Sequence, residues 1–504
     1  MTYILNFNVS SVITHLKQDK IPRFYAIMVL LSIVGFLLNY HLWQLDYLIL
    51  TCFGAGFWII SLLIVNRLKL ITEQVDPEKL RRTVTLFFLL NAGVSLFNLL
   101  QIVLITKSNP YTFTGMDLKY HTSTGDSITG LLFDFSSTNA IINIFGIFYF
   151  LFNRSYLISF LCLVVSLLTT SNTNTILLIA ILFLMILFSR GRFYRTIGLC
   201  YIATIVVFFA RVSPSNVEYV TKELAMTKEQ LPASRTGGPE KHVLTPEEIK
   251  EKQRQVFQRY YVSKLPKNQK HSKANDSSIR KALSKIEIRE KARSNTADPK
   301  FEKEMKTKRD RLAQDIKFFY NDTVVPMQEF SGKHYPGKLM SVIQTLKYSV
   351  SGVKPFLLGA GTGMFSSKTA FKASGMGIFG KYPEKFEYVS ATFRDNNLKV
   401  YCYFFNMPLS KHSVTNTPFS SYNQLLGEYG YIGVFCFLFF YVWFFLKRFK
   451  QLSYGRYLLP LCLLFLIFDY WFEHLSILII FELMMLMDLK TNSNLSKNVS
   501  NPNE

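Results

Sequence analysis

Cysteine is scarce in this sequence, and the short motifs that many soluble enzymes carry are missing. The six cysteines include no C-x-x-C pair, and all but Cys402 lie in apolar runs. This predicts buried small side chains rather than a zinc site or a disulfide framework. The chain has no Walker loop, no G-x-S-x-G elbow and no H-E-x-x-H helix. These absences argue against the chemistry of those motifs, and we expect no cofactor.

Acidic residues are also scarce relative to basic ones. The 504-residue chain has 34 Asp and Glu against 57 Lys and Arg, which gives a formal net charge of +23. Nucleic acid is one partner for such a charge. However, Lys and Arg gather between apolar runs and in one long loop, as the positive-inside rule expects of a membrane protein. We therefore expect membrane lipid, and not nucleic acid, as a partner.

Apolar residues are abundant and form long uninterrupted runs. They make up 49% of the chain, and Phe alone occurs 46 times. A spanning helix needs about 20 mainly apolar residues, and only helices satisfy their own backbone groups in lipid. The sequence therefore predicts an all-α polytopic integral membrane protein of about ten transmembrane helices. The predicted helices are 22–40, 45–65, 84–106, 136–152, 155–171, 173–189, 195–212, 430–447, 456–469 and 474–488.

The distribution of basic residues predicts how these helices are oriented. The connections after the second, fourth, sixth and eighth helices are basic, whereas those at 41–44, 172 and 469–474 carry no Lys or Arg. Placing both chain ends in the cytoplasm satisfies the positive-inside rule. Residues 107–135 and 213–429 then form two loops on the outer face.

The chain divides by composition into five parts. They are an N-terminal membrane bundle (1–212), a charged insertion (213–335), a second outer segment (336–429), C-terminal membrane helices (430–490) and a tail (491–504). The insertion contains a helical face in "PKFEKEMKTKRDRLAQDIKFFY". It is interpreted either as a solvated helical cap or as a surface for anionic glycans or lipid headgroups. The Asn- and Ser-rich tail is expected to be disordered.

Polar and charged residues gather at the predicted outer face. Charges at helix mouths are costly, so they tend to be functional, although each one alone is also explained as a snorkelling interface residue. Because they come from both loops on one side, together they predict an outward-facing site. The candidates are Lys119, His121, Asp126, Asp134, Arg211, Lys338, Arg394, His412, Ser420, Asn423, Glu428, Asp469, Glu473 and His474. Neither loop has the D-x-D pair of metal-dependent sugar transferases, so we expect no metal.

Two glycine-rich segments belong to the same face. The glycines are Gly359, Gly361 and Gly363 in "GAGTGMF" and Gly427, Gly430 and Gly433 in "GEYGYIG". The first segment follows no strand, which favours a tight backbone turn over a dinucleotide site. In the second, the glycines let a helix start close against a neighbour. Glu428 at this entrance either orients a cation such as Lys338 or Arg211, acts as a base, or caps the helix start.

Three segments in this order resemble the O-antigen polymerase and O-antigen ligase group of polytopic glycan transferases. They are "SITGLLFDFSSTNAI" (127–141), "PGKLMSVIQTLKYSVSGVKPFLLGAGTGMF" (336–365) and "NQLLGEYGYIG" (423–433). The resemblance implies transfer of a glycan from an undecaprenyl diphosphate carrier to an acceptor, at the periplasmic face of a bacterial inner membrane. It also implies metal-independent chemistry, and a chain-length regulator as a further protein partner.

The resemblance also assigns roles to residues. Lys338 stands where the family has an Arg that faces the diphosphate, but a lysine is a point charge rather than a bidentate fork. The His-Asn pair of the ligases is replaced by Phe419 and Ser420, with His412 seven residues upstream of the His position. This departure favours a polymerase of lipid-linked repeats. Glu428, Lys338 and His412 are the implied catalytic residues. The implied substrate-binding residues are Lys119, His121, Arg211, Gly359, Gly361, Gly363, Arg394, Ser420 and Asn423.

Other functions stay open. Within the same group, a ligase or a protein-glycosylating relative is the alternative. From other classes, a flippase for lipid-linked sugars or a scaffolding membrane protein also fits a polytopic chain. Transporters often have internal repeats and helices broken near the middle of the bilayer. The sequence has no repeat that we detect and keeps its irregular polar segments at one face, which favours chemistry over transport.

Overall fold

The computed structural model describes most of the chain outside the charged insertion. The described residues are 19–106, 111, 127–132, 135–189, 191–213, 337–374, 382–383, 386, 388–398, 400 and 417–500. Met1–Thr227 and Pro336–Glu504 form one compact unit, and Lys228–Tyr335 forms another. The second unit lies outside the described residues, and so does the helical face predicted for the insertion.

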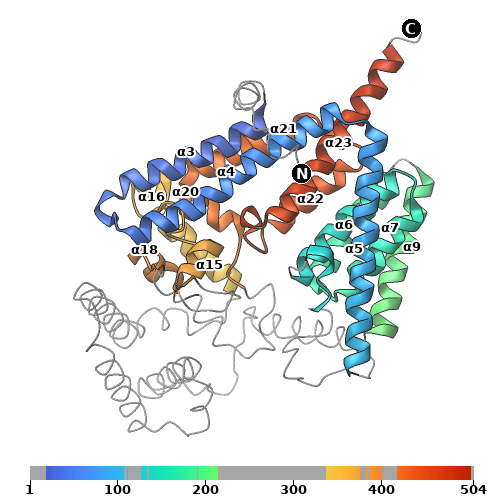
Figure 1. The fold of residues 1–504 in the computed structure, drawn as a ribbon, viewed down its shortest axis with the longest axis horizontal. Coiled ribbons are helices and arrows are strands. Elements are labelled where there is room, and N and C mark those ends of the chain that lie inside the picture. The colour runs from blue at the N-terminus through green and yellow to red at the C-terminus, as the bar shows by residue number, and fades with distance from the viewer. Residues whose placement is uncertain are drawn as a thin grey trace, which may run out of the picture. The chain divides into compact units, whose positions relative to one another are not determined.

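The described residues form helices joined by turns and irregular segments (Figure 1). Five helices are long and apolar enough to cross a membrane, which marks a multi-pass membrane protein. They are α3 (Lys20–Leu38), α4 (Leu45–Gln74), α5 (Pro77–Thr106), α9 with η4 (Arg192–Val207, Phe208–Val212), and α20 with η9 and α21 (Ser421–Cys436, Phe437–Val442, Trp443–Lys447). Further apolar helices are α6 (Ser136–Phe152), α7 (Tyr156–Leu168), α8 (Asn172–Phe188), α22 (Gly455–Phe465) and α23 (Leu475–Ser500).

Each of the ten predicted ranges coincides with one of these helices, but several boundaries differ. α4 continues beyond the predicted end at 65 to Gln74, and α20 begins at Ser421 rather than at 430. α23 remains helical to Ser500, within the tail predicted to be disordered. The prediction followed apolar content. Polar residues continue a helix equally well once it is nucleated, because each added residue gains a backbone hydrogen bond.

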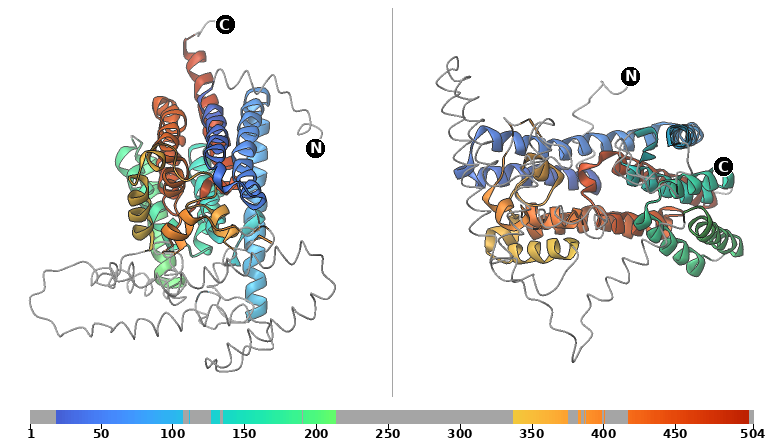
Figure 2. Two further views of the ribbon diagram at one scale, coloured as in Figure 1. Left: turned by 90° about the vertical axis from the view of Figure 1, so that its left-hand side faces the viewer. Right: turned by 90° about the horizontal axis from the view of Figure 1, so that it is seen from below.

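The described part of the segment 336–429, which was predicted to lie in the second outer loop, contains several short helices and packs on the membrane helices. It contains α15 (Gly337–Ser349), α16 (Val353–Leu358), α17 (Lys368–Ala373), α18 (Ala391–Phe393) and η7 (Arg394–Leu398). α15 and α16 contact α20, and α17 contacts α4. α4 in turn lies beside α3, as Figure 2 shows from two further directions. The segment therefore belongs to the helical body rather than to a separate domain.

An aromatic cluster joins the first two helices to α20. The indole of Trp58 on α4 packs edge-on against the rings of Phe24 on α3 and Tyr429 on α20. Trp58 Nε1 also donates a hydrogen bond to the Tyr429 hydroxyl at 2.6 Å. All three side chains are buried, so the cluster fixes α20 against α3 and α4.

α20 is broken at Gly430, and the segment 359–365, called here the glycine loop, supplies hydrogen-bond partners at the break. Gly430 has φ 63° and ψ −165°, which interrupts the helical hydrogen-bond ladder. The carbonyl oxygens of Gly427 and Glu428 accept hydrogen bonds from the amides of Ala360 (2.9 Å) and Gly361 (3.0 Å). Buried backbone carbonyl groups need protein donors, and these two bonds supply them. The two glycine-rich segments therefore bind one another directly.

Glycine is required where these backbones meet. A Cβ on Gly430 would lie 2.5 Å from the carbonyl carbon of Leu357, at a backbone φ that other residues rarely adopt. A Cβ on Gly427 would lie 2.1 Å from Cδ1 of Phe365. The predicted close approach to a neighbouring segment is therefore confirmed for Gly427 and Gly430, whereas a Cβ on Gly433 would meet Tyr429 of the same helix.

Asn39, the residue that follows α3, holds the loop from the other side. Its Nδ2 donates to the carbonyl of Ala360 and lies 3.0 Å from the Tyr47 hydroxyl. Its Oδ1 accepts a hydrogen bond from Lys354 Nζ at 2.6 Å. One amide side chain thus joins α3, α4, α16 and the glycine loop.

Asparagine side chains hold the segment around Gly130, which belongs to the first segment of the family resemblance (127–141). The amide of Leu131, in η3 (Gly130–Leu132), donates to Asn91 Oδ1 on α5 at 2.9 Å. Asn91 Nδ2 donates to Asn139 Oδ1 on α6, and Asn139 Nδ2 donates to Ser95 Oγ. This buried network fixes the entry into α6.

We expect the Gly430→Ala variant to be strongly destabilised. The strained backbone alone costs about 1–3 kcal/mol, and the clash with Leu357 adds to it. Gly56→Ala on α4 is the matched control, because a Cβ there meets nothing within 4 Å. Alanine in a helix interior is favoured over glycine by about 0.5–1 kcal/mol. Melting temperatures in detergent measure both changes, and equal melting of the two variants would contradict this account.

Candidate functional site

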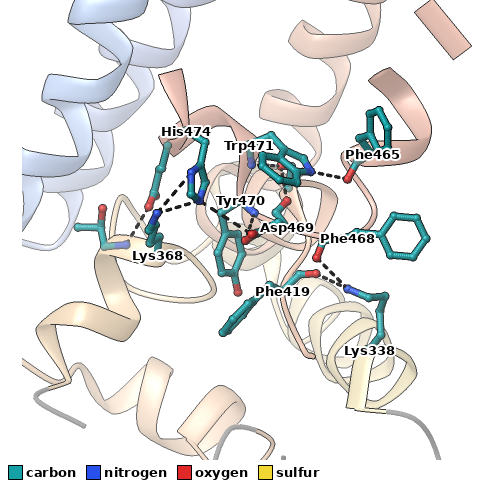
Figure 3. A network of polar contacts seen from close by, with 12 residues as sticks. Lys338, Lys368, Phe419, Phe465, Phe468, Asp469, Tyr470, Trp471 and His474 are labelled. Carbon is teal, nitrogen blue, oxygen red and sulfur yellow. Dashed lines mark hydrogen bonds and ion pairs between the residues drawn. The ribbon is translucent and has the colours of Figure 1, made fainter. Parts of the chain in front are cut away.

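The turn between α22 and α23 is the centre of the candidate site (Figure 3). The predicted helix 456–469 ends at Phe465, and the following residues turn back through η11 (Trp471–Glu473). The Ser421 amide donates to the carbonyls of Leu466 and Asp469, both at 2.9 Å. The Trp471 amide donates to Ser421 Oγ at 2.9 Å. The start of α20 is therefore bound to the turn.

Lys338 connects α15 to this turn through backbone carbonyls. Its ammonium donates to the carbonyls of Ile467 (3.1 Å), Phe468 (3.3 Å) and Phe419, so each of its three N–H groups has an acceptor. Burial lowers the pKa of Lys338 to about 7, while the Asp469 carboxylate opposes that shift. The Lys338 ammonium thus binds the backbone and positions the turn. Its catalytic role against a diphosphate stays a prediction.

Lys368 lies beside His474 on the other side of the turn. Lys368 Nζ is 2.8 Å from His474 Nε2, and Asp469 Oδ2 is 3.9 Å from the same nitrogen. The ammonium also lies 5.4 Å from the ring centre of Phe135, and that ring contacts His474. Among the many lysines of its segment, Lys368 had no sequence signal, and it was not predicted.

Glu473 is buried between α17 and α20. Its Oε2 accepts a hydrogen bond from the Thr369 amide at 2.8 Å, and its Oε1 accepts one from Gln424 Nε2 at 2.6 Å. Burial raises the pKa of Glu473 to about 7, against the opposing effects of the Thr369 amide and the Lys368 ammonium. A carboxyl group with such a pKa exchanges its proton near neutral pH, as a general base must.

Glu428 lies deeper than predicted. Its side chain is 1% exposed, and Oε1 accepts a hydrogen bond from the Phe365 amide at 3.4 Å. Among the described residues Glu428 has no ion-pair partner, so it pairs with neither Lys338 nor Arg211. Because α20 begins at Ser421, seven residues earlier, Glu428 does not cap the helix start. Its role as a base or as an orienting group stays a prediction.

The polar residues at the start of α20 join it to its neighbours. Asn423 Nδ2 donates to Ser341 Oγ on α15 at 2.9 Å. Ser420 Oγ is 3.4 Å from the carbonyl oxygen of Leu466. Both side chains are buried, so these contacts assemble the site around the turn.

The remaining predicted residues are not all brought together. Arg394 lies in η7, which packs against α15. Arg211 lies exposed at the end of η4, without an ion pair to the described site residues. Lys119, His121 and His412 lie outside the described residues.

The comparisons with known proteins give no independent support. The sequence matches no family model, and neither a curated protein nor a solved structure matches it. Within the part of the chain that the structure describes, no group of three His, Cys, Asp or Glu residues is arranged to hold a metal. The resemblance to the O-antigen polymerase and ligase group therefore stays a prediction.

We expect Lys338→Met to destabilise the turn. It removes the hydrogen bonds from Lys338 to three carbonyl oxygens, and it costs about 1–3 kcal/mol for each one that neither water nor another donor reaches. Lys347→Met is the matched control, because Lys347 is exposed on the same helix. The melting temperature should fall for the first variant and stay unchanged for the second. An equal fall in both would refute the positioning role.

Proposed function

We propose that this protein is a surface-polysaccharide polymerase. It joins undecaprenyl-diphosphate-linked oligosaccharide repeats at the outer face of a bacterial inner membrane. The observation that carries the proposal is that the three segments of the family resemblance, far apart in sequence, meet around one turn. A multi-pass helical body suits a lipid-linked substrate.

Each of the three segments supplies a contact at the turn. Phe135 of the first segment packs against His474, and Lys338 of the second donates to the turn carbonyls. Gln424 of the third donates to Glu473. Convergence of separate segments on a cluster of cations and buried carboxyl groups supports a reaction centre.

The chemistry follows from the charges at this cluster. An acceptor hydroxyl attacks the anomeric carbon of the donor, and the bond from that carbon to the diphosphate oxygen breaks. The bonding electrons pass to the leaving diphosphate, where the Lys368 ammonium stabilises the growing negative charge. Glu473 accepts the proton of the attacking hydroxyl. Lys338 holds the turn that carries Glu473.

The pH dependence of the rate tests the assignment of Glu473. Because a base must be ionised, the rate should rise with pH and level off above about 7, where burial places the pKa of Glu473. Glu473→Gln should lower the rate by about 10²–10⁴-fold. The assay follows polymer formation from purified lipid-linked repeats. Glu78→Gln, an exposed residue of α5, is the control. A Glu473→Gln enzyme with wild-type rate would refute this role.

A gel of surface glycolipid tests the function itself in a strain that lacks the gene. Loss of a polymerase reduces the ladder to core with a single repeat, and the wild-type gene restores it. A core without any repeat, together with accumulated lipid-linked polymer, would instead identify the ligase of the same group. An unchanged ladder would contradict both for that glycan and would direct attention to protein glycosylation.

One observation favours the transport alternative. α20 is broken at Gly430, and broken helices line the substrate sites of many transporters. Purified protein in vesicles with lipid-linked repeats separates the two functions. A flippase moves the repeats across the bilayer without lengthening them, whereas a polymerase lengthens them on one side.

A further inference from the structure

Two buried oxygen atoms on α20 lack hydrogen-bond partners. Glu428 Oε2 and Gln424 Oε1 have no donor among the described residues, although the two side chains are 1% and 2% exposed. The residues are four apart in the helix and therefore share one face. A buried acceptor without a donor is destabilising, so native proteins keep only a few of them. Two such atoms on one helix face indicate a missing proton or cation.

We propose that Glu428 is held as a neutral carboxylic acid whose Oε2–H donates a hydrogen bond to Gln424 Oε1. One proton then satisfies both acceptors. The other oxygen of the acid, Oε1, keeps its hydrogen bond from the Phe365 amide, as the carbonyl oxygen of an acid can. Glu428 is thus a protonated residue of α20 whose hydrogen bonds join the glycine loop to this helix.

This hydrogen bond extends into a chain that ends at the proposed base. Gln424 Oε1 accepts the hydrogen bond from Glu428, and Gln424 Nε2 donates to Glu473 Oε1 at 2.6 Å. Glu473 Oε2 accepts from the Thr369 amide. Because Glu473 is the acceptor in both of its bonds, it is the carboxyl group that ionises while Glu428 stays neutral. The assignment of Glu473 as the base rests on the proposed function, whereas the assignment of a proton to Glu428 does not.

Burial and the titratable groups around Glu428 favour its neutral form, and they outweigh the Ser367 hydroxyl and the amides of Gly363 and Phe365, which favour the ionised form. The titratable neighbours are Glu473 of η11, Tyr470 of the turn, Tyr47 of α4 and Tyr429 of α20 itself. Three of these are phenols, which are neutral near pH 7, and the fourth is an acid that repels a second negative charge. In the described part of the chain, no lysine, arginine or histidine forms an ion pair with Glu428.

Infrared spectroscopy tests the proton directly. Purified protein in a detergent without ester groups should have a carboxylic-acid carbonyl band at about pH 8, where unperturbed carboxyl groups are ionised. The band should shift in D₂O and be lost in Glu428→Gln. It should persist in Glu78→Gln, whose carboxylate is exposed. A wild-type spectrum identical to that of Glu428→Gln would overturn the proposal.

Thermal melting tests the hydrogen bond independently of any activity. The amide of Glu428→Gln can still donate to Gln424, so its melting temperature should match wild type at about pH 4, near the pKa of an unfolded Glu. It should exceed wild type increasingly as the pH rises toward about 9, because the wild-type carboxyl group then gains from ionising on unfolding. Glu428→Met has no donor and should melt at a lower temperature than Glu428→Gln at both pH values. Equal melting of the Gln and Met variants would overturn the hydrogen bond.

A bound cation is the competing explanation. If sodium or calcium fills the gap between the two oxygens, adding that ion should raise the melting temperature of wild type but not of Glu428→Gln. That result would overturn the proposal. None of these measurements needs glycosyl transfer, so a negative polymerase assay would not affect the assignment of the proton to Glu428. Conversely, absence of the carboxylic-acid band would overturn that assignment without deciding whether the protein is a polymerase.

Discussion

The structure depends on two backbone hydrogen bonds, from the amides of Ala360 and Gly361 to the carbonyls of Gly427 and Glu428. A broken helix leaves backbone carbonyl groups without their helical donors, and burial keeps water from them, so the break at Gly430 is stable only while the glycine loop covers it. The loop in turn positions Lys368 and Thr369, which follow it in the chain. The contacts of Lys368 with His474 and of Thr369 with Glu473 therefore rest on the same pairing.

Lysine side chains are used repeatedly to satisfy carbonyl groups at the ends of helices. Lys338 donates to Phe419 and to two carbonyls beyond the end of α22. Lys490 of α23 does the same for Thr72, Glu73 and Val75 at the end of α4. An ammonium group suits this position because the helix dipole is negative there and because it carries three donors. Basic residues of this protein thus do structural work as well as setting its charge.

Much of the fold could be predicted from the sequence, because long apolar runs permit little besides helices. The predicted end of α4 and the predicted start of α20 were wrong, because polar residues continue a helix without any hydropathy signal. The glycine contacts were predicted from spacing, since only glycine permits such approach. The pairing of Lys368 with His474 and of Gln424 with Glu473 was not predicted. Those contacts depend on how the turn after α22 folds back, and nothing in the local sequence of either partner encodes that path.

The contact of Asn39 with Ala360 has a consequence for how the chain is made. The two residues are 321 positions apart. At about 5–20 residues per second, the glycine loop is synthesised roughly 16–64 s after Asn39. During that interval the Asn39 amide lacks its final partner. The packing at this end of α3 and α4 is therefore completed only after most of the chain has been made.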